Sequence, residues 1–401
     1  MDNLKKYVKT VISAGINIQP GQKLFVSCPV ECAEFGRLAM EEAYKMGAAR
    51  VHIDWYDQYA KRINYLLAPD TNFGVEYEWL QKYFDHLTED DYRCIFVDSF
   101  DPEIYKDVDP QRIEKNIKVA NKREKQFQQK LDRNEVQWCV VSVPGEGWAK
   151  KVFPNATNPI ETMWEEIFKA TRINEDFDSH LQNLKSIANK LNDYNFKTLH
   201  FTNDLGTDLT VDLPPGHIWL SCGEETDTGD VFIANIPTEE VFTVPHRTGV
   251  NGIVYNTKPL VYMGNIIDGF SLTFKDGMVV ESSVKKSGEK FLNSLLTLEK
   301  NTNYLGEVAL VPYNSPISRS GVLWYNTLFD ENAACHLALG GSYPVCHKEY
   351  KGKTENELEA MGLNQCPEHE DFMISDETTR VEGITQTGEK VTIMENGDYV
   401  I

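Results

Sequence analysis

Residues 331–343 form a small, apolar run that begins with the carboxylate of Glu331 and contains the imidazole of His336. Buried polar side chains need hydrogen-bonding or ionic partners. A divalent metal ion satisfies both a carboxylate and a neutral imidazole. Further candidate ligands stand before and after this run: Glu307, His369 and Asp371. The pattern therefore predicts a metal site.

Two other stretches place acidic side chains among apolar ones. Glu239 and Glu240 lie between two prolines, and in an extended strand they face opposite ways, so at most one of them points inward. Glu307 is the one charge in the apolar run of residues 305–312. A carboxylate in such a run must be paired, protonated or metal-bound.

The run that contains His336 is expected to include a helix from about residue 332 to 339. If residues 331–339 are helical, Glu331 and His336 are about 140° apart around the axis and do not share a face. His336 taken alone is equally well a core histidine with satisfied hydrogen bonds. Tyr343 alone, after Gly340-Gly341-Ser342, is typical of a side chain that packs at a turn.

His369 and Asp371 are two residues apart, so in an extended segment they point the same way while Glu370 faces away. The pair can bind a common metal. Such a pair is weak in isolation, but four patterns of this kind in one half of the chain favour a real site. An oxygen-rich set with few imidazoles suits two divalent ions that share a carboxylate, typically zinc, cobalt or manganese.

The composition excludes several other classes of protein. The net charge of -21, from 61 acidic and 40 basic residues, argues against nucleic-acid binding and against adhesion to anionic membranes. No signal-peptide core and no run of roughly 18 apolar residues is present, so a soluble cytoplasmic protein is expected. The eight cysteines form no CxxC pair and are interpreted as reduced thiols. Glycine-rich phosphate-binding motifs are absent, which argues against a nucleotide cofactor.

The first half of the chain is expected to be an α/β domain, residues 1–190, with a mostly parallel open sheet. Strands are predicted at about 24–28, 50–55, 93–97 and 137–143, with helices over about 31–46, 109–131 and 159–191.

Residues 191–401 are expected to be an α+β catalytic domain with an antiparallel sheet. Strands are predicted at 197–201 and 208–213, a hairpin at 271–281 that turns at Asp276-Gly277, a helix over 285–299, and a final hairpin that turns at Asn396-Gly397.

The motifs together resemble the thermophilic-type aminopeptidases of peptidase family M29, over essentially the whole chain. The resemblance rests on residues 237–243, 306–312 and 330–340 and on the His369/Asp371 pair followed by Phe372-Met373-Ile374. It implies cytosolic, homodimeric metallo-exopeptidases that use two metal ions to remove N-terminal residues from peptides. Residues 1–190 are expected to supply dimer contacts and to restrict access to the site.

Carried onto this sequence, the resemblance implies a metal shell of seven residues: Glu240, Glu307, Glu331, His336, Tyr343, His369 and Asp371. Glu307 is the candidate bridge between the ions, and Glu240 is chosen over Glu239. Glu331 is assigned both as ligand and as the general base that takes a proton from a metal-activated bridging water. Tyr343 is the candidate donor to the oxyanion.

Two other interpretations stay open at this point. One is a two-domain protein that binds a small ligand without catalysis, although the clustered acids and histidines have no role in it. The other is a cysteine hydrolase that uses Cys335 with His336, although neighbouring residues on a helix do not face each other.

Overall fold

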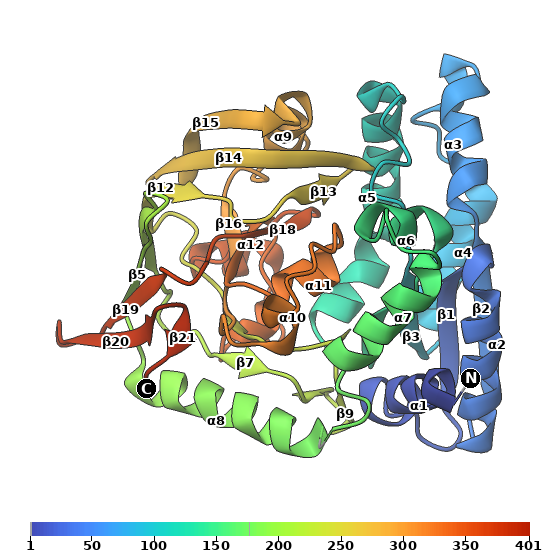
Figure 1. Ribbon diagram of the computed structural model, residues 1–401, viewed down its shortest axis with the longest axis horizontal. Coiled ribbons are helices and arrows are strands. Elements are labelled where there is room, and N and C mark those ends of the chain that lie inside the picture. The colour runs from blue at the N-terminus through green and yellow to red at the C-terminus, as the bar shows by residue number, and fades with distance from the viewer. Residues whose placement is uncertain (1, 176) are drawn as a thin grey trace. The chain divides into compact units, whose positions relative to one another are not determined.

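The computed structural model describes residues 2–175 and 177–401. By internal contacts the chain forms two compact units (Figure 1). Unit 1 contains residues 1–177, 222–238 and 263–265, and unit 2 contains residues 178–221, 239–262 and 266–401. The first crossing lies between Phe177 and Asp178, at the start of the helix α8 (Phe177–Tyr194), which ends near the expected boundary at residue 190. The chain then returns twice to unit 1, which a single sequence boundary does not describe.

Unit 1 is built on the predicted parallel sheet. Its five strands stand in the order β10-β4-β3-β1-β2 and all pair in parallel. They are β1 (Lys23–Pro29), β2 (Arg50–Tyr56), β3 (Tyr92–Asp98), β4 (Trp138–Ser142) and β10 (Asn235–Ile236). The last strand comes from the returning segment, which also forms the small pair β8 (Glu224–Glu225) and β9 (Val231–Phe232).

The helices of unit 1 begin where short polar side chains can accept hydrogen bonds from free backbone N–H groups. Asp57, Asp109 and Asn158 cap three of them in this way. The helices are α1 (Asp2–Thr10), α2 (Ala33–Lys45), α3 (Gln58–Leu67), α4 (Glu78–Glu89), α5 (Pro110–Asp132), α6 (Glu146–Val152) and α7 (Pro159–Ala170).

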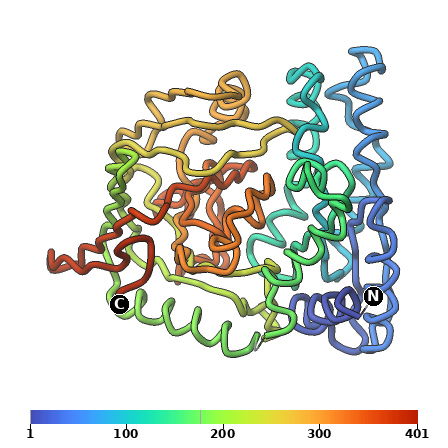
Figure 2. The backbone as a smooth tube through the Cα atoms, in the orientation of Figure 1, coloured from blue at the N-terminus to red at the C-terminus, as the bar shows by residue number. Residues whose placement is uncertain are grey.

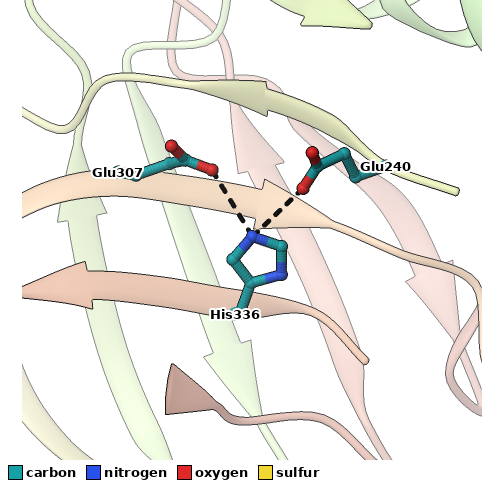
Figure 3. A group of neighbouring side chains, drawn as sticks. All are labelled: Glu240, Glu307 and His336. Atoms are coloured by element: carbon teal, nitrogen blue, oxygen red, sulfur yellow. Dashed lines mark ion pairs between the residues drawn. The ribbon is translucent and has the colours of Figure 1, made fainter. Parts of the chain in front are cut away.

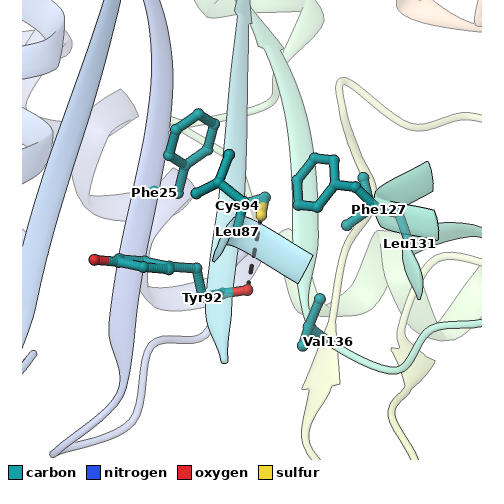
Figure 4. Packing of buried hydrophobic residues seen from close by; sticks show 7 residues of the cluster. All are labelled: Phe25, Leu87, Tyr92, Cys94, Phe127, Leu131 and Val136. Carbon is teal, nitrogen blue, oxygen red and sulfur yellow. Dashed lines mark hydrogen bonds between the residues drawn. The ribbon is translucent and has the colours of Figure 1, made fainter. Parts of the chain in front are cut away.

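The core of unit 1 includes a cluster between the sheet and the helices α4 and α5. It consists of Phe25, Leu87, Tyr92, Cys94, Phe127, Leu131 and Val136 (Figure 4). The Cys94 thiol lies at the centre of this cluster, 3.7 Å from the carbonyl oxygen of Tyr92. All eight cysteines lie in the described part of the chain and none forms a disulfide, so Cys94 acts here as a small apolar side chain.

Unit 2 contains antiparallel sheets, as predicted. Its nine-stranded sheet has the order β13-β14-β12-β6-β5-β19-β20-β21, with β15 paired to β14. The strands are β5 (Thr198–Thr202), β6 (Asp208–Asp212), β12 (Val250–Tyr255), β13 (Leu260–Tyr262), β14 (Asn265–Lys275), β15 (Met278–Ser287), β19 (Arg380–Ile384), β20 (Lys390–Glu395) and β21 (Asp398–Tyr399).

Both predicted hairpins of unit 2 are present, one between β14 and β15 and one between β20 and β21. Asp276 and Gly277 have φ angles of 50° and 84°, and Asn396 and Gly397 have 54° and 76°. Two consecutive positive φ angles are what a tight hairpin turn requires, and asparagine, aspartate and glycine adopt them most readily.

A second, five-stranded antiparallel sheet of unit 2 has the order β18-β17-β16-β11-β7. Its strands are β7 (Leu220–Ser221), β11 (Val241–Thr243), β16 (Leu305–Leu310), β17 (His336–Gly340) and β18 (His369–Met373). In the view of Figure 2, the orange and red segments of this sheet lie between α8 (Phe177–Tyr194) and the β14–β15 hairpin.

The helix predicted at residues 332–339 is wrong, because residues 336–340 form strand β17. The error has a physical cause. Every residue of β17 is buried, so side chains on both of its faces lie in the interior. A short buried run of mostly apolar residues shows no alternation that would distinguish a strand from a helix. The preceding helix, α11, ends at the site residue itself (Thr327–Glu331).

The remaining helices of unit 2 are short: α9 (Glu289–Thr297), α10 (Pro316–Arg319) and α12 (Glu355–Ala360). The helix expected over 285–299 therefore begins four residues late, because Lys285 still belongs to β15. Across the described residues, no helix has the length and apolar character of a membrane span.

Candidate metal centre

Three neighbouring strands bring most of the predicted ligands to one face of the five-stranded sheet. In the strand register, Ala338 of β17 stands opposite Glu307 on one side and Asp371 on the other. Residues directly opposite each other across antiparallel strands project on the same side. His336 is two residues from Ala338 in the same strand and therefore shares that side. His369 is likewise two residues from Asp371.

A fifth residue reaches this face from the chain just before β11. Glu240 Oε2 lies 3.1 Å from His336 Nε2, and Figure 3 shows both side chains together with Glu307. The neighbouring carboxylate turns elsewhere, since Glu239 Oε1 lies 3.7 Å from His180 Nε2 on α8. The structure thus brings Glu240, and not Glu239, to the group of predicted ligands.

These five side chains form two groups of three that share one carboxylate. The first is Glu240, Glu307 and His336, and the second is Glu307, His369 and Asp371, with the donor atoms of each group all within 4.8 Å of one another. Glu307 Oε1 lies 3.4 Å from His336 Nε2, and its other oxygen, Oε2, lies 3.6 Å from His369 Nε2. Asp371 Oδ2 is 3.5 Å from the same His369 atom.

Backbone carbonyls orient both imidazoles. His336 Nδ1 lies 3.0 Å from the carbonyl oxygen of Glu331, and His369 Nδ1 lies 2.8 Å from that of Gly341. A carbonyl oxygen only accepts hydrogen bonds, so each Nδ1 carries the proton and donates it. The Nε2 atoms that face the carboxylates are then free to bind a metal, as in many histidine ligands.

Glu331 and Tyr343 stand beside the two groups rather than within them. Glu331 is the buried last residue of α11, and Asn332 Nδ2 donates a hydrogen bond of 3.4 Å to its Oε1. The half-buried Tyr343 follows β17, with its ring centroid 4.7 Å from that of His369 and 6.4 Å from that of Phe242.

The electrostatics of the group reflect many acids in a buried space. Burial, together with the nearby Asp371 and Glu240, raises the pKa of Glu331 well above its ordinary value. Burial also raises the pKa of Glu307. Burial alone lowers the pKa of His369, but Asp371 and Glu307 outweigh it and raise that pKa to about 10. Without a metal, the imidazoles are therefore the cations that balance the carboxylates.

The residues fit a divalent cation. Glu240, Glu307 and Asp371 have only His336 and His369 as ion-pair partners among the described residues. Asp371 Oδ1 is buried and accepts no hydrogen bond within the described part of the chain. A buried carboxylate oxygen without a hydrogen bond is costly, and oxygen and imidazole donors in this ratio are those that zinc, cobalt and manganese accept.

The cysteine-based alternative has no support in the geometry. The Cys335 thiol lies 3.4 Å from the carbonyl oxygen of Val311 and 3.7 Å from the sulfur of Met394. His336 Nε2 instead faces the carboxylates. Burial raises the pKa of the Cys335 thiol, which disfavours the nucleophilic thiolate.

Sequence reasoning missed two residues that support this group, Asn332 and His180. Each contacts the Glu239–Glu240 segment from a distant part of the chain. Local patterns carry no signal for such partners, because their side chains meet the segment only after folding.

Carboxylates and histidines, most of them buried, in two groups that share one glutamate are the donor set of a metallohydrolase. Residues 1–399 match the family described as thermophilic metalloprotease (M29). The chain belongs to this family of metallopeptidases, and the resemblance drawn from its motifs is confirmed.

The relatives are named for one activity and align over nearly their full length. Aminopeptidase AmpS of Bacillus subtilis is 41% identical over 99% of this chain and 98% of its own. Aminopeptidase T of Thermus aquaticus is 32% identical over 100% of this chain and 99% of its own. The predicted enzyme class, a metallo-aminopeptidase, is confirmed, and the interpretation as a nonenzymatic binding protein is wrong.

A solved structure confirms the predicted fold class. Wild-type AmpT from Thermus thermophilus matches with a TM-score of 0.91 at 32% sequence identity, covering 100% of this chain and 99% of that chain. The pairing of a parallel sheet with later antiparallel sheets is thus shared with a relative.

Proposed function

We propose that the two groups of three hold two divalent cations and that peptides with a free N-terminus are hydrolysed beside them. The observation that carries this proposal is the shared carboxylate of Glu307. Its two oxygens face two different imidazoles, at 3.4 Å and 3.6 Å. A carboxylate placed in this way can contribute one oxygen to each of two ions.

In this proposal one cation is held by Glu240, Glu307 and His336, and the other by Glu307, His369 and Asp371. Zinc, cobalt and manganese are the candidate metals. Two such ions would supply a water of lowered pKa as the nucleophile and would polarise the carbonyl of the scissile peptide bond.

The residues beside the ligands supply the proton transfer and the hydrogen bonding. Glu331 lies outside both groups of three, which supports the role of general base over that of ligand. As base, its carboxylate accepts the water proton and returns it to the leaving amine. The hydroxyl of Tyr343 donates a hydrogen bond to the oxyanion that forms at the carbonyl. The preference for N-termini follows from the acidic surroundings, which attract a cationic α-amino group.

We further propose that the enzyme is a cytoplasmic homodimer in which residues 1–190 make dimer contacts and restrict access to the site. Tyr59, Ile63 and Leu67 support the dimer contacts. They recur every four residues on α3, so they share one helix face, and they are 41%, 58% and 80% exposed. Sedimentation of an Ile63→Glu/Leu67→Glu variant tests this contact. The variant is expected to be monomeric at concentrations where the parent protein is dimeric.

One experiment tests the catalytic proposal. Metal content and hydrolysis of aminoacyl-chromophore substrates are measured before and after treatment with a chelator. Two metals per chain and activity that returns with cobalt or zinc are expected. Activity that survives the chelator but is lost to a thiol reagent would instead implicate a cysteine, and full activity without bound metal would end the two-metal proposal.

A further inference from the structure

Asn332 is a fully buried residue that links two parts of the proposed site. Its Oδ1 accepts a hydrogen bond of 2.7 Å from the backbone N–H of Glu239. Its Nδ2 donates to the carbonyl oxygen of Leu328 at 2.8 Å and to Glu331 Oε1 at 3.4 Å. One amide group therefore contacts the segment that carries Glu240 and the helix end that carries Glu331.

The surroundings allow only one orientation of this amide. The backbone N–H of Glu239 only donates, so the amide oxygen must face it. The carbonyl of Leu328 and the carboxylate of Glu331 accept, so the amide nitrogen must face them. A rotation of the group by 180° would set donor against donor and acceptor against acceptor, with buried groups left unpaired.

Neither of the two linked segments belongs to a long helix or strand. Glu239 and Glu240 lie outside any regular element, just before the three-residue strand β11. α11 is only five residues long, and Glu331 is its last residue. The buried Asn332 amide joins the backbone at Glu239, next to Glu240, to the helix end at Leu328 and Glu331.

We propose that Asn332 is a positioning residue of this enzyme, which sets the Glu240 ligand and the Glu331 base in register with each other. The inference rests on the proposed function, because it assigns Glu240 to the metal and Glu331 to proton transfer. Asn332 acts through these two groups and touches neither the metal nor the substrate.

Two substitutions distinguish the positioning of the Glu331 base from the positioning of the Glu240 ligand. Asn332→Asp keeps an oxygen for the Glu239 N–H but sets an acceptor against Leu328 and Glu331. We expect cobalt affinity within about threefold of the parent and a kcat lowered by roughly 10- to 100-fold, the range seen for outer-shell partners. Asn332→Leu removes all three hydrogen bonds of the amide, and we expect cobalt affinity and kcat each to fall by about 10- to 100-fold.

Asn256 offers a matched control in the same unit. It is also a buried asparagine, and it also joins two backbone segments, accepting 2.6 Å from the Phe270 N–H and donating 2.8 Å to the Lys258 carbonyl. None of these partners belongs to the proposed site. Asn256→Leu is expected to lower thermal stability while cobalt affinity and kcat of the folded protein stay as in the parent.

The readouts are cobalt titration of the metal-free full chain, followed by the visible absorption of the bound ion, and kcat and KM measured at saturating cobalt. Parent-like kcat and cobalt affinity in both Asn332 variants would overturn the inference, as would equal losses in Asn256→Leu. A parent protein that binds no cobalt would overturn the proposed metal centre itself, which distinguishes the two failures.

Discussion

The negative charge of the acidic side chains is balanced by different partners in the two units. In unit 1, Asp57 accepts hydrogen bonds from the backbone N–H groups of Tyr59 and Ala60 at 2.9 and 3.0 Å, and Asp101 accepts one from Glu103 at 3.0 Å. In unit 2, the carboxylates of Glu307 and Asp371 form ion pairs with the imidazoles of His336 and His369, and the four residues stand on the adjacent strands β16, β17 and β18. Carboxylates satisfied by the main chain need no cation, whereas a buried group of carboxylates does.

The comparison teaches that the number of acidic residues does not locate a metal site. Both units are rich in them, but among the described residues the buried carboxylates lie in unit 2, where paired strands hold Glu307 and Asp371 in the interior. Repulsion between these carboxylates destabilises the folded state, and a bound cation would offset this destabilisation.

The largest effect is expected for Glu307→Gln. Loss of the shared carboxylate removes one ligand from each group of three, so both metals and all measurable hydrolysis should be lost. Metal analysis and a chromogenic assay check this. Glu370→Gln is the matched control, because Glu370 lies one residue from Asp371 in β18 and projects on the opposite side of the strand. Full turnover and full metal content in Glu307→Gln would contradict the assignment.

Glu331→Gln should lower kcat by roughly 10²- to 10⁴-fold, the usual contribution of a general base. Because Glu331 lies outside both groups of three, metal content should stay at the parent level. Metal analysis together with steady-state kinetics distinguishes a general base from a metal ligand. Loss of a metal in this variant would show that Glu331 is a ligand.

Tyr343→Phe should lower kcat by about 10²-fold through loss of one hydrogen bond to the oxyanion. The ring contacts with His369 and Phe242 are kept, so the melting temperature should not change. An unchanged kcat would assign Tyr343 to packing alone.

Metal binding should release protons near pH 8. The pKa of His369 is about 10 in the absence of metal, because nearby Asp371 and Glu307 more than offset its burial. At pH 8 this imidazole is therefore protonated, and it must become neutral to bind a metal. Affinity should accordingly weaken as the pH falls from 10. Calorimetry in buffers of different ionisation enthalpy measures the released protons, and a heat independent of buffer would contradict the prediction.

The smallest effect is expected at a carboxylate of unit 1. Asp57→Ala removes the cap of α3 and should lower the free energy of unfolding by about 0.5–2 kcal/mol. Urea denaturation measures this change. Metal content and kcat should equal those of the parent. A loss of metal in this variant would contradict the conclusion that the carboxylates of unit 1 do not contribute to the metal site.

The sequence predicted the parallel sheet of unit 1 well because its strands and helices differ in period and are separated by clear signals. Asp109 before Pro110 marked the start of α5, and Gly47 marked the end of α2. The same kind of pattern gave a wrong prediction at β17, where a helix was expected, because a strand buried on both faces shows no alternation of polar and apolar residues. It also gave no hint that residues 222–238 return to unit 1, because pairing between distant strands leaves no local pattern.

The candidate site divides in the same way. Residue types and spacing by themselves determined the chemistry, since His369 and Asp371 share one side of any extended strand and Glu307 is a lone charge in an apolar run. Only the tertiary structure decided that Glu240 turns inward while Glu239 turns to His180, and that Asn332 holds both segments. A side chain's direction in a loop depends on partners distant in sequence, whereas its direction in a strand follows from the geometry of the strand itself.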